Sequence, residues 1–362
     1  MAKQKYYTLK QILKYKALYN VIIGQRSNGK TYSVLKLMID GFIDEGLPSA
    51  YIRRLDSEIK KSEVEHLLDP HREYVEKRTK GKYNDFVYKS KVFYLCKRDE
   101  NGDILATSDP VIYCVALSLS TKTKGQDRGQ IKYTVFDEFL TRDFYLTNEF
   151  VRYTEILSSL MRDRDGTIHF LLGNTVNKYC PYIDEMGLTN LPEQKQGTID
   201  LYTYGDSELT VAVEYCAEST SAKGVQKYFA FDNPHLQMIT KGIWEFANYP
   251  HITESVKHAD VKYKIYLSFA HKTLCLDVVR NRDLYIRVTP QTHTIPDNHI
   301  VFTTEPTPNP YYITAPNKSD NRLISTVWKL IQSGKVFYSD NTTGEVFNNW
   351  IKWLIKNTMW RA

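Results

Sequence analysis

Four residues near the start of the chain have the types and spacing of a phosphate-binding loop. Gly24, Gly29, Lys30 and Thr31 fit the pattern GxxxxGK[ST] within NVIIGQRSNGKTYSVLKLMI, residues 20–39. Glycines let backbone N–H groups curve around a polyphosphate, the lysine neutralises phosphate charge, and the threonine hydroxyl can bind Mg²⁺. Such a loop needs a strand before it and a helix after it, because the helix N-terminus attracts the phosphates.

That context is present. The apolar run at residues 21–23 predicts a strand, and the periodic stretch from Tyr32 onward predicts a helix. A glycine-rich turn that binds nothing is the alternative, and the flanking pattern disfavours it. The bound ligand is therefore expected to be ATP or GTP. The residues expected to contact it are Gly24, Gln25, Arg26, Ser27, Asn28, Gly29, Lys30, Thr31 and Tyr32.

The stretch YTVFDEFL supplies the expected companion of this loop. It places Asp137 at the end of an apolar run, with Glu138 directly after it. Phosphoryl transfer needs positioning and charge compensation more than covalent chemistry. We therefore expect Thr31 and Asp137 to hold Mg²⁺ and Glu138 to polarise the attacking water. Without the phosphate loop, two solvated carboxylates at a strand end would be the simpler interpretation.

Three further polar residues lie in LMRDRDGTIHFLLGNT. Asn174 ends an apolar strand and is either a sensor of the γ-phosphate or an ordinary turn asparagine. Arg162 and Arg164 precede that strand and form either a solvated charge cluster or an arginine finger. A finger neutralises transition-state charge at a neighbouring subunit's nucleotide, and arginine does so without deprotonating. The basic stretch STKTKGQDRGQ, which includes Lys124, either reaches a neighbour or faces solvent.

The composition is that of a globular chain with room for two domains, at 362 residues and 42% hydrophobic. No run of about 18 apolar residues is present, and the start lacks the apolar core of a secretory signal. We therefore expect a soluble protein of a cell interior with no membrane partner. The five cysteines are scattered singly, which suggests neither a zinc site nor a disulfide framework. A net charge of +6 permits a nucleic-acid partner without requiring one.

Strands and helices alternate up to residue 217, which predicts an α/β domain with a parallel sheet covered on both faces. The expected strands are residues 21–23, 50–53, 111–117, 133–136 and 168–172. A basic insertion at residues 77–107 predicts a β-hairpin around Asn101-Gly102 that projects from the sheet rather than joining its core. Residues 218–260 are expected to be a linker region with a helix at 239–249. Residues 261–362 then form a small α+β domain, with three strands within 262–289 and helices at 322–331 and 346–355.

The order of the strands favours one division of the P-loop proteins. The strand at 111–117 falls between the phosphate-loop strand and the strand that ends at Asp137. Together with the adjacent Glu138, this order resembles the additional-strand catalytic-glutamate division of P-loop ATPases. The sequence contains no NKxD guanine-recognition motif, so ATP is favoured over GTP.

Taken together, these residues resemble the DNA-packaging (encapsidation) ATPases of small tailed phages, the φ29-like family. The resemblance covers most of the chain and rests on GQRSNGKT, VFDEF, RDRDGTIHFLLGN and the short C-terminal domain. It implies a homo-oligomeric ring, a pentamer in the family, that uses ATP to drive double-stranded viral DNA into a preformed prohead. It also implies a place in the cytoplasm of the infected bacterial host, at the portal vertex, and absence from the mature virion.

The family resemblance also implies roles for single residues. Arg164, or else Arg162, would be the finger donated in trans, and Lys124 a second trans cation. Arg26 would bridge the nucleotide site and Glu138, and Asn174 would be the sensor. The C-terminal domain would resemble a ribonuclease-H-type nuclease that has lost its active site and docks to the prohead, in some members through a structural RNA. In the basic insertion, Lys77, Arg78, Lys80 and Lys82 are expected to contact DNA phosphates.

Two other functions stay open at this point. A terminase-like motor with an active C-terminal nuclease needs several convergent carboxylates, and the C-terminal strands supply Asp277 with Asp283 in a turn. A nucleotide-gated protein that only switches its contacts with capsid or portal is the second. Such a switch has no need of a catalytic glutamate at position 138.

Overall fold

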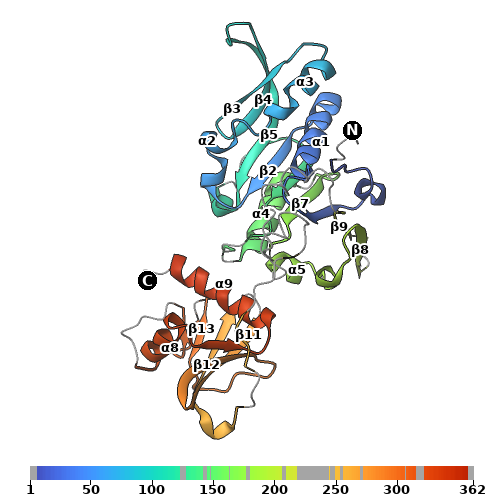
Figure 1. Cartoon of the computed structure of the whole chain (residues 1–362). Helices are drawn as coiled ribbons and strands as arrows, with labels where there is room; N and C mark the ends of the chain where they lie inside the picture. Colours follow the sequence, from blue (N-terminus) through green and yellow to red (C-terminus); the bar gives the residue numbers. More distant parts are fainter. Residues whose placement is uncertain are drawn as a thin grey trace, which may run out of the picture. The chain divides into compact units, whose positions relative to one another are not determined.

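The computed structural model describes residues 6–122, 128–141, 145–146, 148–162, 164–176, 180–205, 209–217, 244, 249–252, 256–269, 272–305, 307–314 and 322–357. The chain divides into two compact units, residues 1–142 with 149–245 and residues 143–148 with 246–362 (Figure 1). In the described part of the chain, no helix has the length and apolar character needed to cross a lipid bilayer.

The N-terminal unit is built on one mixed sheet. Its strands are β1 (Tyr19–Gly24), β2 (Ser49–Arg53), β3 (Asp85–Lys89), β4 (Val92–Arg98), β5 (Ile104–Ala116), β6 (Tyr133–Asp137), β7 (Ile168–Asn174), β8 (Thr198–Tyr204) and β9 (Leu209–Tyr215). Their spatial order is β3-β4-β5-β2-β6-β7-β1-β9-β8. In this spatial order, the strands β5, β2, β6, β7, β1 and β9 pair with one another in parallel. The pairs β3–β4, β4–β5 and β9–β8 are antiparallel. The parallel sheet and its five expected strands are therefore confirmed.

Helices cover both faces of this sheet because its central strands are apolar on both sides. The helices are α1 (Lys30–Glu45), α2 (Lys61–Val64), α3 (Arg72–Arg78), α4 (Glu149–Met161) and α5 (Pro181–Glu185). Alternate side chains of β6 point to opposite faces of the sheet. Val135 packs in the cluster that contains the buried side of α1, whereas Phe136 contacts Tyr153 of α4 and Tyr182 of α5. Asp137 has the same parity as Val135, so its carboxylate points toward the start of α1.

The basic insertion joins the sheet, contrary to expectation. Strands β3 and β4 extend it beyond β5, and Phe86, Phe93 and Leu95 are buried in the core. The reason is that the alternating residues of these strands supply one apolar face, which gains more by covering the sheet than by facing water. The turn at Asn101-Gly102 is confirmed between β4 and β5, and its surroundings at residues 101–107 are the part that projects (Figure 1).

In the sheet, β7 lies between β1, which precedes the phosphate loop, and β6, which ends at Asp137. The strand predicted for this position was residues 111–117. That predicted strand is the end of β5 and lies beyond β2. Order in the sequence does not determine order in a sheet, because after β6 the chain crosses over through α4 and returns between β6 and β1. Strands β8 and β9 were not predicted, and β9 lies parallel to β1 on its other side.

The C-terminal unit is a second sheet with two helices. Its elements are β10 (Val261–Phe269), β11 (Lys272–Asn281), β12 (Asp283–Pro290), β13 (Val301–Thr303), β14 (Tyr312–Ile313), α8 (Arg322–Gln332), β15 (Val336–Tyr338) and α9 (Asn341–Asn357). The strand order is β14-β13-β10-β11-β12-β15. Strands β10, β11 and β12 form an antiparallel meander, and β13 is parallel to β10. The three predicted strands and two predicted helices are confirmed.

Part of the predicted linker belongs to this second unit. The backbone N–H groups of Tyr338 and Ile252 donate to the carbonyl oxygens of Pro250 and Tyr338, at 2.9 and 3.4 Å. The aromatic ring of Tyr249 lies so close to α9 that a Cβ on Gly344 would be 2.4 Å from it. Residues 249–252 are thus docked on the C-terminal unit. The helix predicted at 239–249 lies outside the described residues, apart from Trp244 and Tyr249.

Candidate functional site

The phosphate loop joins β1 to α1 at the edge of the sheet where the parallel strands end. Its backbone turns through left-handed conformations at Ser27 (φ 57°) and Gly29 (φ 95°), the second of which glycine adopts without steric cost. Gly24 is required for a different reason, because a Cβ there would lie 2.9 Å from Cβ of Cys216, just after β9. The glycine spacing in the sequence therefore reflects one turn and one close approach.

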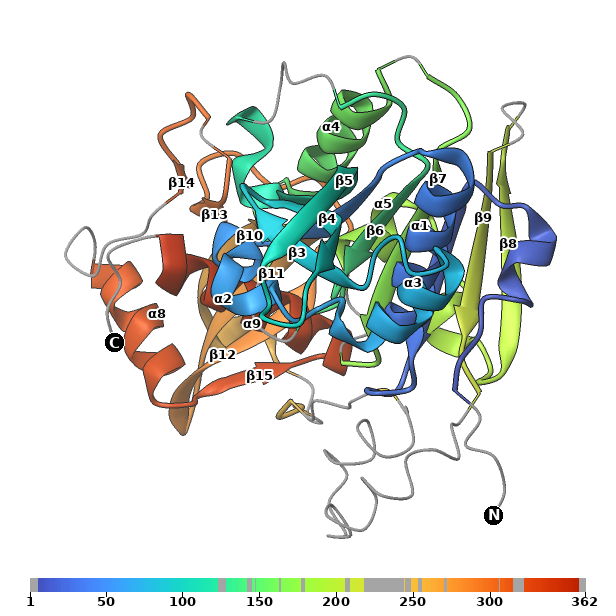
Figure 2. The ribbon, with the colours of Figure 1, turned by 90° about the horizontal axis from the view of Figure 1, so that it is seen from above.

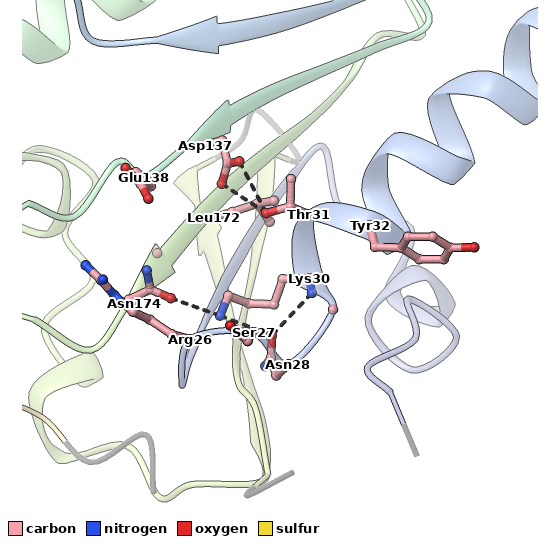
Figure 3. Close-up of a pocket in the computed structure, with 12 residues that line it drawn as sticks. Arg26, Ser27, Asn28, Lys30, Thr31, Tyr32, Asp137, Glu138, Leu172 and Asn174 are labelled. Atoms are coloured by element: carbon pink, nitrogen blue, oxygen red, sulfur yellow. Dashed lines mark hydrogen bonds between the residues drawn. The ribbon is translucent and has the colours of Figure 1, made fainter. Parts of the chain in front are cut away.

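Lys30 is buried inside its own loop. Its Nζ atom donates to the carbonyl oxygen of Gln25 at 2.8 Å, to Oδ1 of Asn28 at 3.2 Å and to Oδ1 of Asn174 at 3.4 Å (Figure 3). The lysine is 6% exposed, and burial lowers its pKa to about 8. A desolvated ammonium group held only by neutral oxygens is a strong site for an anion.

Asp137 lies opposite, at the carboxyl end of β6. Its two carboxylate oxygens accept from the Thr31 hydroxyl at 3.3 and 3.2 Å, and one also accepts from the Tyr51 hydroxyl at 3.1 Å. Burial raises the pKa of Asp137, and the nearby positive charge of Arg53 works in the opposite direction. A hydroxyl and a carboxylate in contact are the oxygen ligands that Mg²⁺ prefers, so these two residues fit the predicted metal position.

Glu138 is held by an arginine that sequence analysis did not single out. Its Oε2 atom accepts from the guanidinium of Arg53 at 2.8 Å, and Arg53 also bonds Glu58 at 3.1 Å. Burial acts against the charge of Arg53, but the neighbouring Tyr51, Glu138 and Asp137 more than offset this and raise its pKa. Glu138 itself has a left-handed backbone (φ 60°) and a side chain that is 51% exposed. The carboxylate is thus at the mouth of the site, tethered to the end of β2.

A buried ion pair fixes the backbone around Glu138. Arg54 donates to both carboxylate oxygens of Glu149, the first residue of α4, at 2.9 to 3.1 Å. The same guanidinium donates to the carbonyl oxygens of Glu138 at 3.1 Å and Phe139 at 2.7 Å. The Tyr182 hydroxyl adds a bond to Glu149 at 3.1 Å. Arg54 therefore joins β2, the turn after β6 and α4 around the candidate catalytic glutamate.

These residues enclose a cavity of 370 Å³ at the carboxyl ends of β1, β6 and β7 (Figure 3). Open parallel sheets bind ligands at this edge. The structure brings together segments that lie more than one hundred residues apart in the sequence. The lining residues are Arg26, Ser27, Asn28, Gly29, Lys30, Thr31, Tyr32, Asp137, Glu138, Leu172, Gly173 and Asn174. Of the other predicted contacts, Gly24 and Gln25 lie at the base of the loop, where both carbonyl oxygens accept from Lys30.

The family model described as podovirus DNA encapsidation protein (Gp16) matches residues 1–337 of the chain. The chain belongs to this encapsidation protein family. Among curated proteins it is 25% identical over 185 residues to the DNA packaging protein of Bacillus phage phi29, and 27% identical over 180 residues to that of Bacillus phage B103. These matches cover 50% and 49% of this chain. The chain spans about half the length of the curated relatives it matches, 50% in each case.

Two solved structures share the fold over nearly the whole chain. One is described as the Phi-28 gp11 DNA packaging motor, with a TM-score of 0.59, 18% identity and coverage of 97% of this chain and 98% of that one. The other is the bacteriophage Phi-29 viral genome packaging motor assembly, with a TM-score of 0.57 and the same identity and coverage. At this identity the likeness concerns the fold.

The remaining candidate residues of this encapsidation-family chain are placed as follows. Arg162 and Arg164 lie between α4 and β7, before the amino end of β7, whereas the cavity lies at the carboxyl end of this strand, which is about 20 Å long. Burial lowers the pKa of Arg128, Tyr113 opposes this, and the charge of Arg162 lowers the pKa further. Lys124 lies outside the described residues.

For two predicted contacts, one of Arg26 with Glu138 and one of the basic insertion with DNA, the structure shows some of the residues bonded to other partners. In the described part of the chain, the ion pair of Glu138 is with Arg53, whereas Arg26 is known only to line the same cavity. A bridge from Arg26 to Glu138 stays a prediction. In the basic insertion, Arg78 is bound to Asp44 of α1 and Lys77 to Glu73. Contact of these residues with DNA also stays a prediction.

Sequence reasoning missed Arg53, Arg54 and Glu149. A signal was available for the two arginines, because they follow the apolar run at 50–52 and so end a strand at the same edge of the sheet as the phosphate loop. Glu149 had no such signal. It is separated from Arg54 by 95 residues, and only the packing of α4 against the sheet brings it there.

We expect Arg54→Ala to lower the free energy of unfolding by about 3–5 kcal/mol, because it removes the positive charge that compensates the buried carboxylate of Glu149. Arg72→Ala is the matched control, since Arg72 pairs with Asp69 and Asp85 while its side chain is 47% exposed. Such a pair contributes about 1 kcal/mol or less. Urea unfolding of both variants, followed by circular dichroism, measures the difference. Equal losses in the two variants would contradict the assigned role of Arg54.

Proposed function

We propose that this encapsidation-family protein hydrolyses ATP to drive double-stranded viral DNA into a preformed prohead, as one subunit of a ring-forming packaging motor. The single observation that supports it best is the cavity that unites Lys30, Thr31, Asp137, Glu138 and Asn174. The strand order β9-β1-β7-β6-β2, with a strand between those of the phosphate loop and Asp137, supports assignment to the additional-strand catalytic-glutamate division. The motor would work at the portal vertex in the cytoplasm of the infected host, and not in the mature virion.

Each residue of the cavity would have its own role in the proposed hydrolysis. Mg²⁺, for which Thr31 and Asp137 fit, would supply charge neutralisation at the phosphates when bound. Lys30 would exchange its loop oxygens for the more negative oxygens of the ATP β- and γ-phosphates. Glu138 would orient a water molecule and accept its proton, and Asn174 would bond the γ-phosphate. Arg53 holds the Glu138 carboxylate at the mouth of the site through one of its two oxygens, Oε2.

We expect Lys30→Ala to abolish tight ATP binding, whereas Glu138→Gln keeps binding and stops turnover. The lysine supplies charge to the ground state, and the glutamate acts mainly in the transition state. An equilibrium binding assay and a phosphate-release assay, with and without proheads and DNA, measure the two effects separately.

Lys14→Ala is the matched control, because Lys14 is a lysine of the same unit that bonds only the neighbouring Gln11 in the described residues. It should change neither binding nor turnover. The reverse pattern, with turnover surviving in Glu138→Gln, would overturn the assignment of the catalytic base.

For the C-terminal unit we propose docking, by direct contact with the prohead or through a structural RNA. Residues 246–362 hold 14 of the 48 lysines and arginines but 9 of the 42 aspartates and glutamates, so most of the net charge of +6 lies there. A ribonuclease-H-like fold is supported by the order β12-β11-β10-β13-β14, in which an antiparallel meander continues into parallel strands. We propose residues 1–217 as the ATPase domain, 218–260 as a linker region whose residues 249–252 pack on the C-terminal unit, and 261–362 as the docking domain.

We expect this unit to leave DNA uncut in Mg²⁺ or Mn²⁺. Its buried acid, Asp277, is neutralised by Lys264 at 2.9 Å and Arg287 at 2.6 Å, which together hold its pKa below the usual range despite burial. Two-metal cleavage needs several free carboxylates. A plasmid-nicking assay on the full chain checks this. Cleavage that disappears in Asp277→Asn would instead support the terminase-like alternative.

For the ring we propose that Arg164, or else Arg162, completes the active site of the neighbouring subunit. At each interface of the ring, the edge of one subunit's sheet where the parallel strands begin would then face the edge of the next subunit's sheet where they end. Lys124 is a further candidate for the same role, and a pentamer is the stoichiometry that we propose from the family resemblance.

We expect Arg164→Ala to depress hydrolysis strongly while leaving ATP affinity nearly intact, because the missing charge acts in the transition state. Mixing Arg164→Ala with Glu138→Gln subunits, each inactive alone, should restore part of the activity at interfaces that unite an intact arginine with an intact glutamate. Phosphate release from mixed rings is the measurement. If mixed rings form and stay inactive, Arg164 does not act in trans, and the same mixtures made with Arg162→Ala and Lys124→Ala identify the residue that does.

A further inference from the structure

Asp137, which the proposed function makes a ligand of Mg²⁺, is bonded by a tyrosine of the neighbouring strand. The hydroxyl of Tyr51, on β2, donates to Oδ2 of Asp137 at 3.1 Å. The Thr31 hydroxyl lies 3.2 Å from the same oxygen and 3.3 Å from Oδ1. Among the described residues, Oδ1 is therefore bonded only by Thr31, whereas Oδ2 has a second donor. The two oxygens of this carboxylate are thus not equivalent.

A long side chain is required for this bond, because Tyr51 and Asp137 are not directly opposite each other in the sheet. The partner of Tyr51 on β6 is Val135, and Asp137 is the next residue of β6 on the same face. Neighbouring strands lie about 4.8 Å apart and two residues span about 6.6 Å along a strand, so the two Cα atoms are about 8 Å apart. The phenol ring crosses this diagonal and brings its hydroxyl to the carboxylate.

The position of the Tyr51 hydroxyl is fixed by the core of the N-terminal unit. Tyr51 is 3% exposed and belongs to the apolar cluster that contains Leu35 and Met38 of α1. A phenol is protonated at neutral pH, so it donates to the carboxylate. Turning Asp137 away would leave a buried hydroxyl without this partner, which is unfavourable. The packing of the ring therefore restrains the orientation of the carboxylate.

We propose that Tyr51 is a positioning residue for the metal, which holds Oδ2 of Asp137 by its hydroxyl and so leaves Oδ1 for Mg²⁺. This inference rests on the proposed nucleotide site. Metal ligands are commonly oriented by hydrogen bonds from residues that do not themselves touch the metal, and loss of such a bond typically weakens metal binding about 10–100-fold. Tyr51 does not line the phosphate cavity, which agrees with a place behind the ligand.

The test compares ADP binding in saturating Mg²⁺ with ADP binding in EDTA, by calorimetry on the full chain. Tyr51→Phe keeps the ring and removes only the hydroxyl. It should weaken ADP binding in Mg²⁺ about tenfold or more, because the protein then holds the metal less tightly. The affinity in EDTA should not change, since the phosphate loop and Lys30 are unaltered.

Tyr88→Phe is the matched control, because Tyr88 is also buried in the N-terminal unit and does not line the cavity. Its hydroxyl donates to the carbonyl oxygen of Ile59 at 2.6 Å, so the variant loses a bond of the same kind elsewhere. It should leave both affinities unchanged. Adding Tyr51→Phe to Asp137→Asn should cause no further loss in Mg²⁺, because the hydroxyl acts through this carboxylate.

Equal weakening by Tyr51→Phe in Mg²⁺ and in EDTA would mean that Tyr51 only supports the fold of the loop. Unchanged binding in Mg²⁺ would mean that the hydroxyl does not orient Asp137, and a further loss in the double variant would mean that it acts by another route. Each of these results overturns the proposal and leaves the phosphate site intact. The same holds if Mg²⁺ does not strengthen ADP binding by the unchanged protein. If that protein binds no ADP in either condition, the proposed nucleotide site itself is wrong, and the inference falls with it.

Discussion

The Arg54–Glu149 pair is the interaction on which the geometry of the candidate active site depends. A planar guanidinium has donors enough for a bidentate carboxylate and two carbonyl oxygens at once, and here Arg54 uses them on Glu149, Glu138 and Phe139. Without it, the carbonyl groups of Glu138 and Phe139 in the turn after β6 would lose this donor. The left-handed backbone at Glu138 is held in place by this arrangement.

The charged groups of the candidate site are already paired with groups of the protein. Lys30 is bound to neutral oxygens of its loop, Asp137 to two hydroxyl groups, and Glu138 to Arg53. For Lys30 and Asp137, a phosphate or a metal ion would offer a more strongly charged partner than these neutral groups do. The site is therefore preorganised by electrostatics, and ligand binding exchanges partners without building the site anew.

The sequence predicted what is local in this protein and missed what is assembled across long separations. The phosphate loop, Asp137 and the strands that position them are contained in short stretches whose periodicity and glycines determine their geometry. The interposed strand was assigned wrongly, because β7 follows β6 in the chain yet inserts beside β1. Likewise, the basic residues of the insertion suggested a projecting hairpin, while the aromatic residues between them, such as Phe86 and Phe93, decided its packing against the sheet. Arg54 and Glu149 could be related only through the tertiary fold.

Helix α1 is fastened along its length to α3, which lies beside it (Figure 2). Asp40 is bonded to Tyr74, and Asp44 accepts two bonds from Arg78 at 2.7 and 2.9 Å. The 16 residues of α1 make a rod of about 24 Å whose first turn is the phosphate loop. A tilt of about 10° at the loop would displace the far end by about 4 Å, taking α3 with it. In mechanical terms, α1 would act as a lever if the proposed nucleotide moved its first turn, with the antiparallel edge of the sheet at its far end.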